Sequence, residues 1–402
     1  MRDTLPIRAT GAYRPTGRPR CHYAGPVDGR TGGGRRQRAV QWAGQWAGAL
    51  ALAGVLAVAG CTGPARTTGG TAVTSGAPAA SAAPAASPPG ASGTGDVTLA
   101  FAGDVHFQDR TATLLADPGT AFGPIAGTLS AADLTMLNLE TAVTDRGTPQ
   151  PKQFHFRTGP AGLAAVQAAG VDVVTVANNH VLDYGQVGLA DTLAALARAG
   201  LPYVGAGVDA AHAWAPYLVT VKGLRLAILG VSQVDELAAS WVATDSRPGE
   251  AHADDLTRTL AAVRAAKARA DVVIVFMHWG TEGVGCPDAR QRALAPKLAA
   301  AGADVIIGAH AHTLQGSGWL GRTFVAYGMG NFLWWKQSYS AETGVLRLTL
   351  HRDGSPVSVR FLPAVVSGTG QPVLATGAQA QQIADRYAGL RGCAGLSAAP
   401  GR

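Results

Sequence analysis

Beyond its first 60 residues, the chain lacks an excess of charge of either sign. Its formal net charge is +7, from 33 Lys and Arg against 26 Asp and Glu. Nine of the arginines fall within residues 1–60, together with only two acidic residues, Asp3 and Asp28. The rest of the chain therefore carries 24 basic and 24 acidic side chains. A nucleic-acid partner requires a basic surface, so we exclude that class of protein.

Cysteine is scarce, with four residues in 402. Cys21 and Cys61 lie in or next to an N-terminal leader, which leaves Cys286 and Cys393 for the remainder of the chain. In an oxidising compartment these two residues could form a disulfide that ties the C-terminal tail to the core. Two free thiols are the alternative.

One uncharged stretch, residues 39–60, is long enough to act as a targeting signal. It follows Arg35, Arg36 and Arg38 and ends in small residues, which is typical of a secretory signal. An uncleaved transmembrane helix is the alternative, because about 20 apolar residues can span a bilayer. The residues after Arg35-Arg36 fit a twin-arginine signal poorly. The end of the stretch, Val58-Ala59-Gly60-Cys61, resembles a bacterial lipobox, which implies lipidation of Cys61.

Residues 61–95 contain little but Ala, Pro, Ser, Thr and Gly. Such a composition cannot bury enough apolar surface to offset its ordering entropy, so we expect a flexible tether. We therefore predict a signal peptide with lipobox over 1–60, a lipidated cysteine and tether over 61–95, and a folded part exported to the outer face of the cell membrane.

Strand and helix patterns alternate along the remainder of the chain, which predicts an α/β fold with substantial parallel character. Short apolar runs rich in Val and Ile are typical of buried strands. Between them lie amphipathic stretches, several of which end at a glycine. We expect a main domain over 96–345. After it, over 346–402, a hairpin around Asp353-Gly354, a helix and a tail should pack on that domain.

Each of five predicted strands ends in residues that can bind metal. In chain order these residues are Asp104, His106, Glu140, Asn179, His180, His278, His310 and His312. Ligands in open α/β sheets sit at the carboxyl ends of strands, and two histidines spaced two apart on an extended segment point the same way. The donors exceed what one ion needs and include no thiolate, so we expect two divalent transition metals, Mn, Fe or Zn.

Single members of this set could have structural roles instead. Asp104 could be a helix N-cap, and Asn179 and His180 could cap the helix that starts nearby. Glu140 could simply form an ion pair with Arg157 or Arg110. The same two arginines could also bind an anionic substrate.

Six short motifs occur in an order that resembles the calcineurin-like metallophosphoesterases and, more closely, the CapA family of capsule-synthesis proteins linked to poly-γ-glutamate. They are Gly103-Asp104, Asn138-Leu139-Glu140, Asn178-Asn179-His180 with Asp183, His278-Trp279-Gly280 with Glu282, Gly308-x-His310-x-His312, and the run from Tyr327 to Phe332. The resemblance covers about residues 97–340. It implies a layered α/β sandwich of the metallo-dependent phosphatase type, with a C-terminal β-hairpin and helix.

The resemblance also implies roles for these residues. One metal would be held by Asp104, His106 and His312, and the other by Asn179, His278 and His310, with Glu140 bridging. His180 would protonate a leaving group, and Asp183 would orient its ring and raise its pKa. Glu282, which belongs to one of the six motifs, is a candidate for substrate contacts, and Arg110 and Arg157 are candidates on their charge alone. Two features depart from the families: the calcineurin-like enzymes bridge with an aspartate, and many CapA relatives lack a histidine at the position of His106.

We therefore predict an exported hydrolase with two metals that acts on an anionic substrate, either a phosphoester or a poly-γ-glutamate amide, with capsule synthesis machinery as a candidate partner. The alternative is a non-catalytic factor that assembles or retains anionic polymer at the same site. A solute-binding lipoprotein would share the anchor and the α/β pattern, but it would not need five histidines at strand ends.

Overall fold

A computed structural model of the chain describes residues 95–401. The predicted signal peptide, Cys61 and all but the last residue of the predicted tether lie outside this range. Among the residues described, no helix combines the length and the apolar character needed to cross a bilayer.

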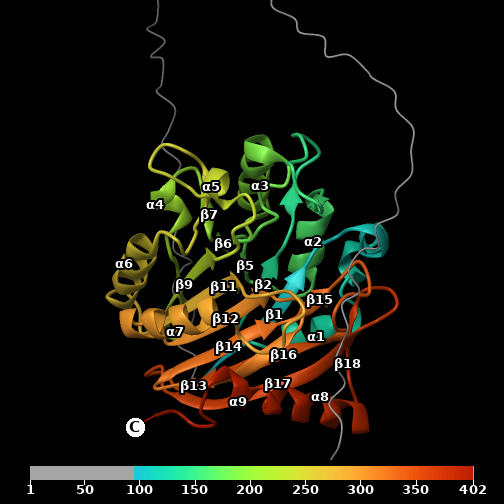
Figure 1. The fold of residues 1–402 in the computed structure, drawn as a ribbon. Coiled ribbons are helices and arrows are strands. Elements are labelled where there is room, and N and C mark those ends of the chain that lie inside the picture. Colours follow the sequence, from blue (N-terminus) through green and yellow to red (C-terminus); the bar gives the residue numbers. More distant parts are fainter. Residues whose placement is uncertain (1–94, 402) are drawn as a thin grey trace, which may run out of the picture. The chain divides into compact units, whose positions relative to one another are not determined.

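The first of two large mixed sheets has the strand order β18-β17-β16-β1-β2-β5-β6, with β15 paired to β1 beside this path (Figure 1). Strands β1, β2, β5 and β6 are parallel, and β16 to β18 continue the sheet with antiparallel strands. The bounds are β1 Val97–Val105, β2 Leu134–Leu139, β5 Val173–Thr175, β6 Tyr203–Val204, β15 Asn331–Leu333, β16 Glu342–Leu350, β17 Pro356–Val366 and β18 Pro372–Leu374.

The second sheet has the order β13-β14-β12-β11-β9-β8. Its four central strands are parallel, and β8 and β13 pair antiparallel at the edges. The bounds are β8 Tyr217–Val221, β9 Leu224–Ser232, β11 Val272–Trp279, β12 Val305–His310, β13 Leu314–Leu320 and β14 Thr323–Met329. Two small pairs complete the strands: β3 (Ala142–Val143) with β4 (Arg157–Thr158), and β7 (Ala206–Gly207) with β10 (Gly249–Glu250).

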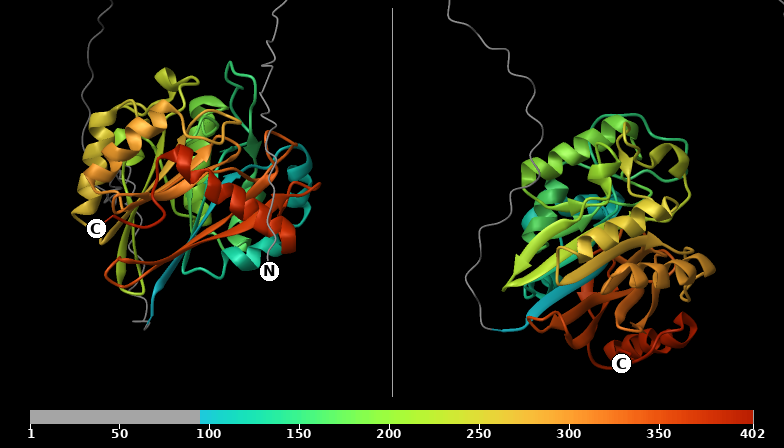
Figure 2. Two further views of the ribbon diagram at one scale, coloured as in Figure 1. Left: turned by 60° about the horizontal axis from the view of Figure 1, so that its bottom comes forward. Right: turned by 90° about the vertical axis from the view of Figure 1, so that its left-hand side faces the viewer.

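Helices cover the outer faces of the two sheets. Helices α2 (Pro160–Ala168) and α3 (Gly185–Ala199) pack on the first sheet, and α6 (Leu256–Lys267) and α7 (Ala289–Ala301) pack on the second. Helix α8 (Gly377–Gly389) lies against β13 and β17, in red in Figure 2. The shorter helices are η1 Asp109–Ala116, η2 Pro118–Thr120, η3 Gly123–Ile125, α1 Ala126–Leu129, α4 Ala210–Ala213, α5 Ala238–Trp241 and α9 Arg391–Ala394.

The alternation of side chains along the strands explains this layering. On β1, Leu99 and Phe101 belong to the core between the sheets, where they join Ile274 and Phe276 of β11. Ala100, which points the other way, belongs to the core beneath the outer helices. Because successive side chains alternate between the two faces of a sheet, strands that are apolar on both faces need a layer on each side. The result is a helix–sheet–sheet–helix sandwich, and it confirms the predicted fold class.

The C-terminal hairpin is part of the first sheet. Strand β16 pairs with β1 from Val97–Leu350 to Phe101–Leu346. The predicted domain boundary between residues 345 and 346 therefore falls inside a strand, because the hairpin continues the sheet of the main domain.

Two glycines allow the strands at the site to approach closely. A Cβ at Gly103 of β1 would lie 1.8 Å from the carbonyl oxygen of Gly330. A Cβ at Gly308 of β12 would lie 1.9 Å from that of Tyr327. Both distances are far below van der Waals contact, so no larger residue fits there without a shift of the backbone. Gly103 directly precedes the predicted metal ligand Asp104, and Gly308 lies two residues before the predicted ligand His310.

Candidate metal centre

The carboxyl ends of strands from both sheets meet at one place. The pairing of β1 with β2 sets Asp104 opposite Asn138, two residues before Glu140. In the second sheet, His278 of β11 lies opposite Ala309 of β12, next to His310. The donors gathered here are Asp104, Glu140 and Asn179 from the first sheet, and His278, His310 and His312 from the second; all are at most 8% exposed.

Two carboxylates of this cluster, Asp104 and Glu140, are fully buried. Asn138 Nδ2 donates hydrogen bonds to Asp104 Oδ1 at 2.8 Å and to Glu140 Oε2 at 3.2 Å. Burial, and next the charge of Asp104, raises the pKa of Glu140 well above its ordinary value. Two carboxylates this close inside a protein repel one another, and a bound cation relieves that repulsion.

Two histidines of the cluster, His278 and His310, are held neutral. Burial, together with the neighbouring imidazoles, lowers the pKa of His278 well below its ordinary value and that of His310 to about 4. Neutral imidazole, with a free lone pair, is the form that binds metal ions. The donor atoms group as Glu140 with His278 and His310, Asp104 with Glu140 and His312, and Glu282 with His310 and His312, in each case within 4.8 Å of one another.

Three donor atoms of the cluster lack a hydrogen-bond partner, although one of them, His312 Nδ1, lies 3.3 Å from Asp104 Oδ2. Glu140 Oε1, His310 Nδ1 and His312 Nδ1 are buried without a hydrogen bond to any residue within 95–401. A buried polar atom without a partner is costly, so three at one point are explained by a ligand that the protein is built to hold. Two divalent metals fit this donor set.

His106 lies beside the cluster rather than in it. Both of its ring nitrogens are buried and lack a partner in the described part of the chain, yet it belongs to none of the three donor groups. Its ring stacks on Phe156 at 4.1 Å and meets the edge of Trp334 at 4.3 Å. Its assignment as a ligand therefore stays a prediction.

The way in which His310 and His312 reach the site differs from the prediction. We expected two alternate residues of an extended segment to face the same way. Instead β12 ends at His310, and both residues have positive φ, 86° and 52°. Positive φ is uncommon in residues other than glycine and is concentrated at functional sites. A turned backbone, not strand alternation, brings the two rings to a centroid distance of 5.7 Å.

His180 and Asp183 form the predicted dyad, with His180 Nδ1 2.6 Å from Asp183 Oδ2. His180 Nε2 lies 3.7 Å from Glu140 Oε1, so the free end of the ring faces the cluster of donor residues. The expectation that Asp183 raises the pKa of His180 is wrong. Burial lowers that pKa well below its ordinary value, and the charge of Lys152, whose ammonium lies 3.5 Å from His180 Nδ1, lowers it in the same direction.

A cavity of about 440 Å³ opens onto the cluster. Its wall includes Glu282, whose carboxylate accepts a hydrogen bond from the Tyr339 hydroxyl at 2.8 Å. Lys336 lies over the rings of Phe154 and Trp335, at 4.2 and 4.5 Å. Asn179, His180 and His312 also line the cavity. A substrate bound here would therefore touch both the dyad and the metal donors.

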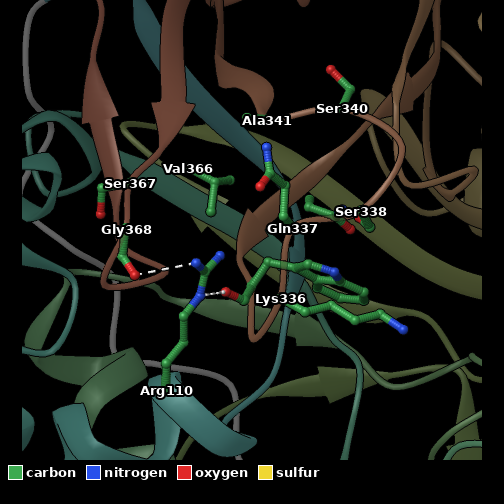
Figure 3. Close-up of a pocket in the computed structure, with 11 residues that line it drawn as sticks. Arg110, Lys336, Gln337, Ser338, Ser340, Ala341, Val366, Ser367 and Gly368 are labelled. Atoms are coloured by element: carbon green, nitrogen blue, oxygen red, sulfur yellow. Dashed lines mark hydrogen bonds between the residues drawn. The ribbon is translucent and has the colours of Figure 1, made fainter.

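Neither Arg110 nor Arg157 lines this cavity, and their assignment to substrate binding stays a prediction. Arg110 lines a neighbouring cavity of about 170 Å³, which shares Trp334 and Lys336 with the first. It donates to the carbonyl oxygens of Trp334 and Gly368, both at 3.1 Å (Figure 3). The exposed Arg157 stacks over Tyr184 at 4.7 Å. Neither forms an ion pair with Glu140 in the structure. The positions of these two arginines in the sequence could not show which loops their side chains contact.

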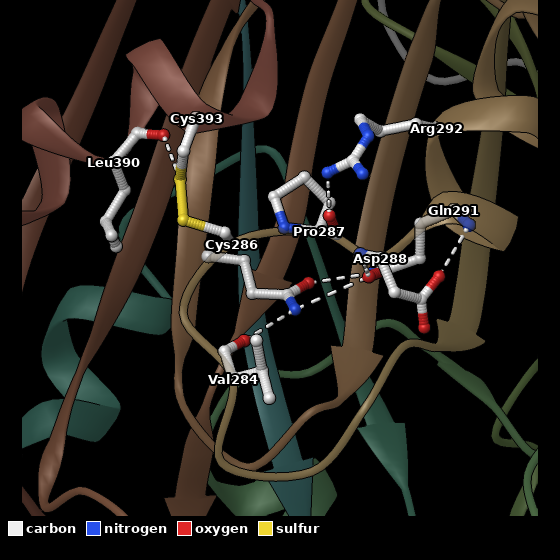
Figure 4. Close-up of a disulfide and its surroundings, with 9 residues drawn as sticks. Val284, Cys286, Pro287, Asp288, Gln291, Arg292, Leu390 and Cys393 are labelled. Atoms are coloured by element: carbon white, nitrogen blue, oxygen red, sulfur yellow. Dashed lines mark hydrogen bonds between the residues drawn. A yellow bond between two sulfur atoms is a disulfide. The ribbon is translucent and has the colours of Figure 1, made fainter. Parts of the chain in front are cut away.

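The structure pairs Cys286 with Cys393, as the cysteine pattern led us to expect (Figure 4). Cys286 lies two residues before Asp288, the N-cap of α7, and Cys393 lies in α9. The bond thus ties the C-terminal helices to the loop that follows β11, the strand that carries His278.

Three polar residues around the cluster were not predicted from the sequence. Asn138 belongs to a predicted motif, but its amide contact with both carboxylates was not foreseen. Lys152 and Glu236 belong to none of the motifs; their side chains are 2.8 Å apart beside Asn179. Glu236 follows strand β9, so the rule that donors follow strand ends would have found it.

Fold and site together define the class of protein. It is a layered α/β sandwich with a buried histidine–carboxylate cluster at the ends of its strands. The model of the bacterial capsule synthesis protein PGA_cap family matches residues 98–334. The chain belongs to this family.

Individual relatives support the assignment to this family. The chain is 33% identical over 288 residues to the capsule biosynthesis protein CapA of Bacillus anthracis, covering 69% of each chain. It is also 33% identical over 255 residues to a probable polyglutamine synthesis accessory protein of Mycobacterium tuberculosis, covering 59% of this chain and 67% of that one. Among solved structures, a 5'-nucleotidase precursor from Thermus thermophilus is 18% identical with a TM-score of 0.43, covering 73% of this chain and 58% of that one.

Proposed function

We propose that this protein is a metal-dependent hydrolase of capsule biosynthesis, held at the outer face of the cell membrane, which acts on an anionic substrate. The substrate would be a phosphoester or an amide of poly-γ-glutamate. The observation that carries the proposal is the set of buried donor atoms that lack hydrogen-bond partners, placed beside the His180–Asp183 dyad at a cavity.

The donors would divide between two ions, with Glu140 shared. Its carboxylate belongs both to the group with His278 and His310 and to the group with Asp104 and His312. Divalent metals bound there would supply the Lewis acidity that activates water and neutralises charge on the substrate. Asn138 supports this arrangement, because its amide holds both carboxylates in place.

The dyad handles a proton. Asp183 accepts hydrogen bonds from His180 Nδ1, at 2.6 Å, and from the backbone N–H of Phe156, also at 2.6 Å. This fixes the Nδ1–H tautomer and leaves a lone pair on Nε2. His180 is thus first a proton acceptor, and it becomes the acid that protonates a leaving group only after it has taken up a proton there.

Location outside the membrane rests on the lipobox-like Val58-Ala59-Gly60-Cys61 and on the disulfide, a bond typical of oxidising compartments. Cell fractionation tests it, since Cys61→Ala should move the protein from the membrane to the soluble fraction. A membrane-bound Cys61→Ala variant would contradict the lipid anchor.

The activity is tested by metal analysis of the purified protein together with a panel of phosphoester and γ-glutamyl substrates. We expect close to two transition-metal equivalents and turnover of one substrate class. His180→Ala should keep its metal and lose turnover by about 10²–10⁴-fold, the usual contribution of a general acid or base.

The remaining outcomes are equally informative. Wild-type protein without metal, and without activation by added Mn or Zn, would contradict the metal centre. Metal-loaded protein that binds poly-γ-glutamate but hydrolyses nothing would instead favour the non-catalytic assembly or retention factor. Equal loss of metal and turnover in His180→Ala would make His180 a ligand.

A further inference from the structure

Lys152 occupies an unusual position for a lysine, because its side chain is only 1% exposed. It lies in the segment between β3 and β4, over the ring of Trp241 at 5.1 Å. Its ammonium group is 2.9 Å from Asp183 Oδ1 and 2.8 Å from Glu236 Oε2, and it also donates to the backbone carbonyl of Asn179. A buried ammonium requires such partners, and all three belong to the surroundings of the proposed metal centre.

Glu236 extends this network to a proposed ligand. Its Oε2 accepts a hydrogen bond from Asn179 Nδ2 at 3.0 Å, in addition to the contact with Lys152. Asn179 Oδ1 then faces the cluster, 2.9 Å from His278 Nε2. Glu236 Oε2 thus contacts both the Lys152 ammonium and the Asn179 NH₂ group.

The direction of the Asn179 amide decides whether this residue can bind a metal. The carbonyl oxygen of an asparagine has lone pairs to offer, whereas its NH₂ group only donates. The two ends of an amide are nearly identical in shape, so packing alone does not select between them. The acceptor on the NH₂ side, Glu236, is what turns the oxygen toward the cluster.

We propose that Glu236, held in place by Lys152, is a positioning residue that fixes the Asn179 amide with its oxygen toward the metal. The inference rests on the proposed metal centre. Because Lys152 also holds Asp183, the same pair links the orientation of this ligand to the dyad. Partners of this kind, one shell beyond the ligands, typically change metal affinity by about 10–100-fold when removed.

The test is binding of Zn²⁺ alone to chelator-stripped full-length protein, followed by competition with a chromophoric chelator, so no substrate is needed. Glu236→Ala should weaken one of the two ions, the one bound through Asn179, by about 10–100-fold and leave the other unchanged. Glu236→Gln keeps an oxygen acceptor for Asn179 and should restore most of the affinity. Asp245→Ala is the control, because it removes a carboxylate that pairs with Arg258 and belongs to none of the possible metal-binding groups among the described residues.

The side chain of Glu236 is 37% exposed, so its replacement should leave the fold intact. Wild-type binding of two ions with an unchanged isotherm in Glu236→Ala would overturn the positioning role and leave the metal centre standing. Equal weakening of both ions would overturn it too, as would a Gln variant no better than Ala, which would give Glu236 a purely electrostatic role. A wild-type protein that binds no Zn²⁺ would overturn both proposals.

Discussion

Glu250, on strand β10, is fully buried, and neither of its carboxylate oxygens has a hydrogen-bond partner within the described range. Burial raises the pKa of this carboxyl well above its ordinary value of 4.5, while the charge of Lys152 acts in the opposite direction. The folded protein therefore keeps a proton on Glu250 at pH values where the unfolded chain has lost it. Its contribution to stability is complete below about pH 4.5 and is lost as the pH rises toward its folded pKa.

We accordingly expect Glu250→Gln to stabilise the protein relative to wild type at pH 8, because glutamine is neutral in both states. The difference in the free energy of unfolding should change by up to about 1.4 kcal/mol per pH unit above pH 4.5, until the folded pKa is reached. Urea unfolding of both proteins between pH 4.5 and 8 measures this. At pH 4.5 the advantage should be smallest, and a difference that stays constant across the range would contradict the buried proton.

Single residues also show where sequence reasoning stops. The types and order of the donors from Asp104 to His312 could be predicted, because each follows a buried strand. The contacts of Arg110 could not be predicted, because its partners lie 224 and 258 residues away along the chain. Glu236 was missed because it lies four residues beyond Ser232, the last residue of β9, and belongs to none of the six motifs.

At the scale of elements, the buried strands were the most predictable, because runs such as Val272–Met277 are continuously apolar. Strand β13 was missed, since Gln315-Gly316-Ser317-Gly318 has neither apolar alternation nor β-branched residues. It forms only because β14 offers an edge and helices α8 and α9 cover it. Pairing of this kind depends on the assembled sheet, which no local pattern encodes.

The disulfide is the element-scale feature most open to experiment, because it joins two segments 107 residues apart in the sequence. A cross-link of that span restricts the unfolded chain, so its loss should destabilise the folded state. We expect the double variant Cys286→Ser/Cys393→Ser to lower the free energy of unfolding by about 2–4 kcal/mol in urea titrations. Reductant should lower the stability of wild type to that of the variant and leave the variant unchanged. Equal stability of the two proteins without reductant would contradict the cross-link.

At the scale of the whole domain, the donors come from different sheets. Asp104 and Glu140 belong to the first sheet, whereas His278 and His310 belong to the second, and the two sheets otherwise meet through an apolar core. Ions bound by both sets would connect the layers at the end of the sandwich where buried polar atoms lack partners. Without metal, that end carries the repulsion of two buried carboxylates and the cost of unpaired imidazoles.

Metal binding should therefore stabilise the domain as one unit. In scanning calorimetry, Zn²⁺ or Mn²⁺ added to chelator-stripped protein should raise Tm of a single transition. The gain is about 2.7 kcal/mol for each ion present at 100 times its Kd. Glu140→Ala removes the carboxylate shared by the two proposed ions, so its Tm should respond far less to metal. The control variant Asp245→Ala, which leaves these donors intact, should respond like wild type. A metal-independent Tm in wild type, or an equal rise in Glu140→Ala, would show that the two sheets are not joined through this cluster.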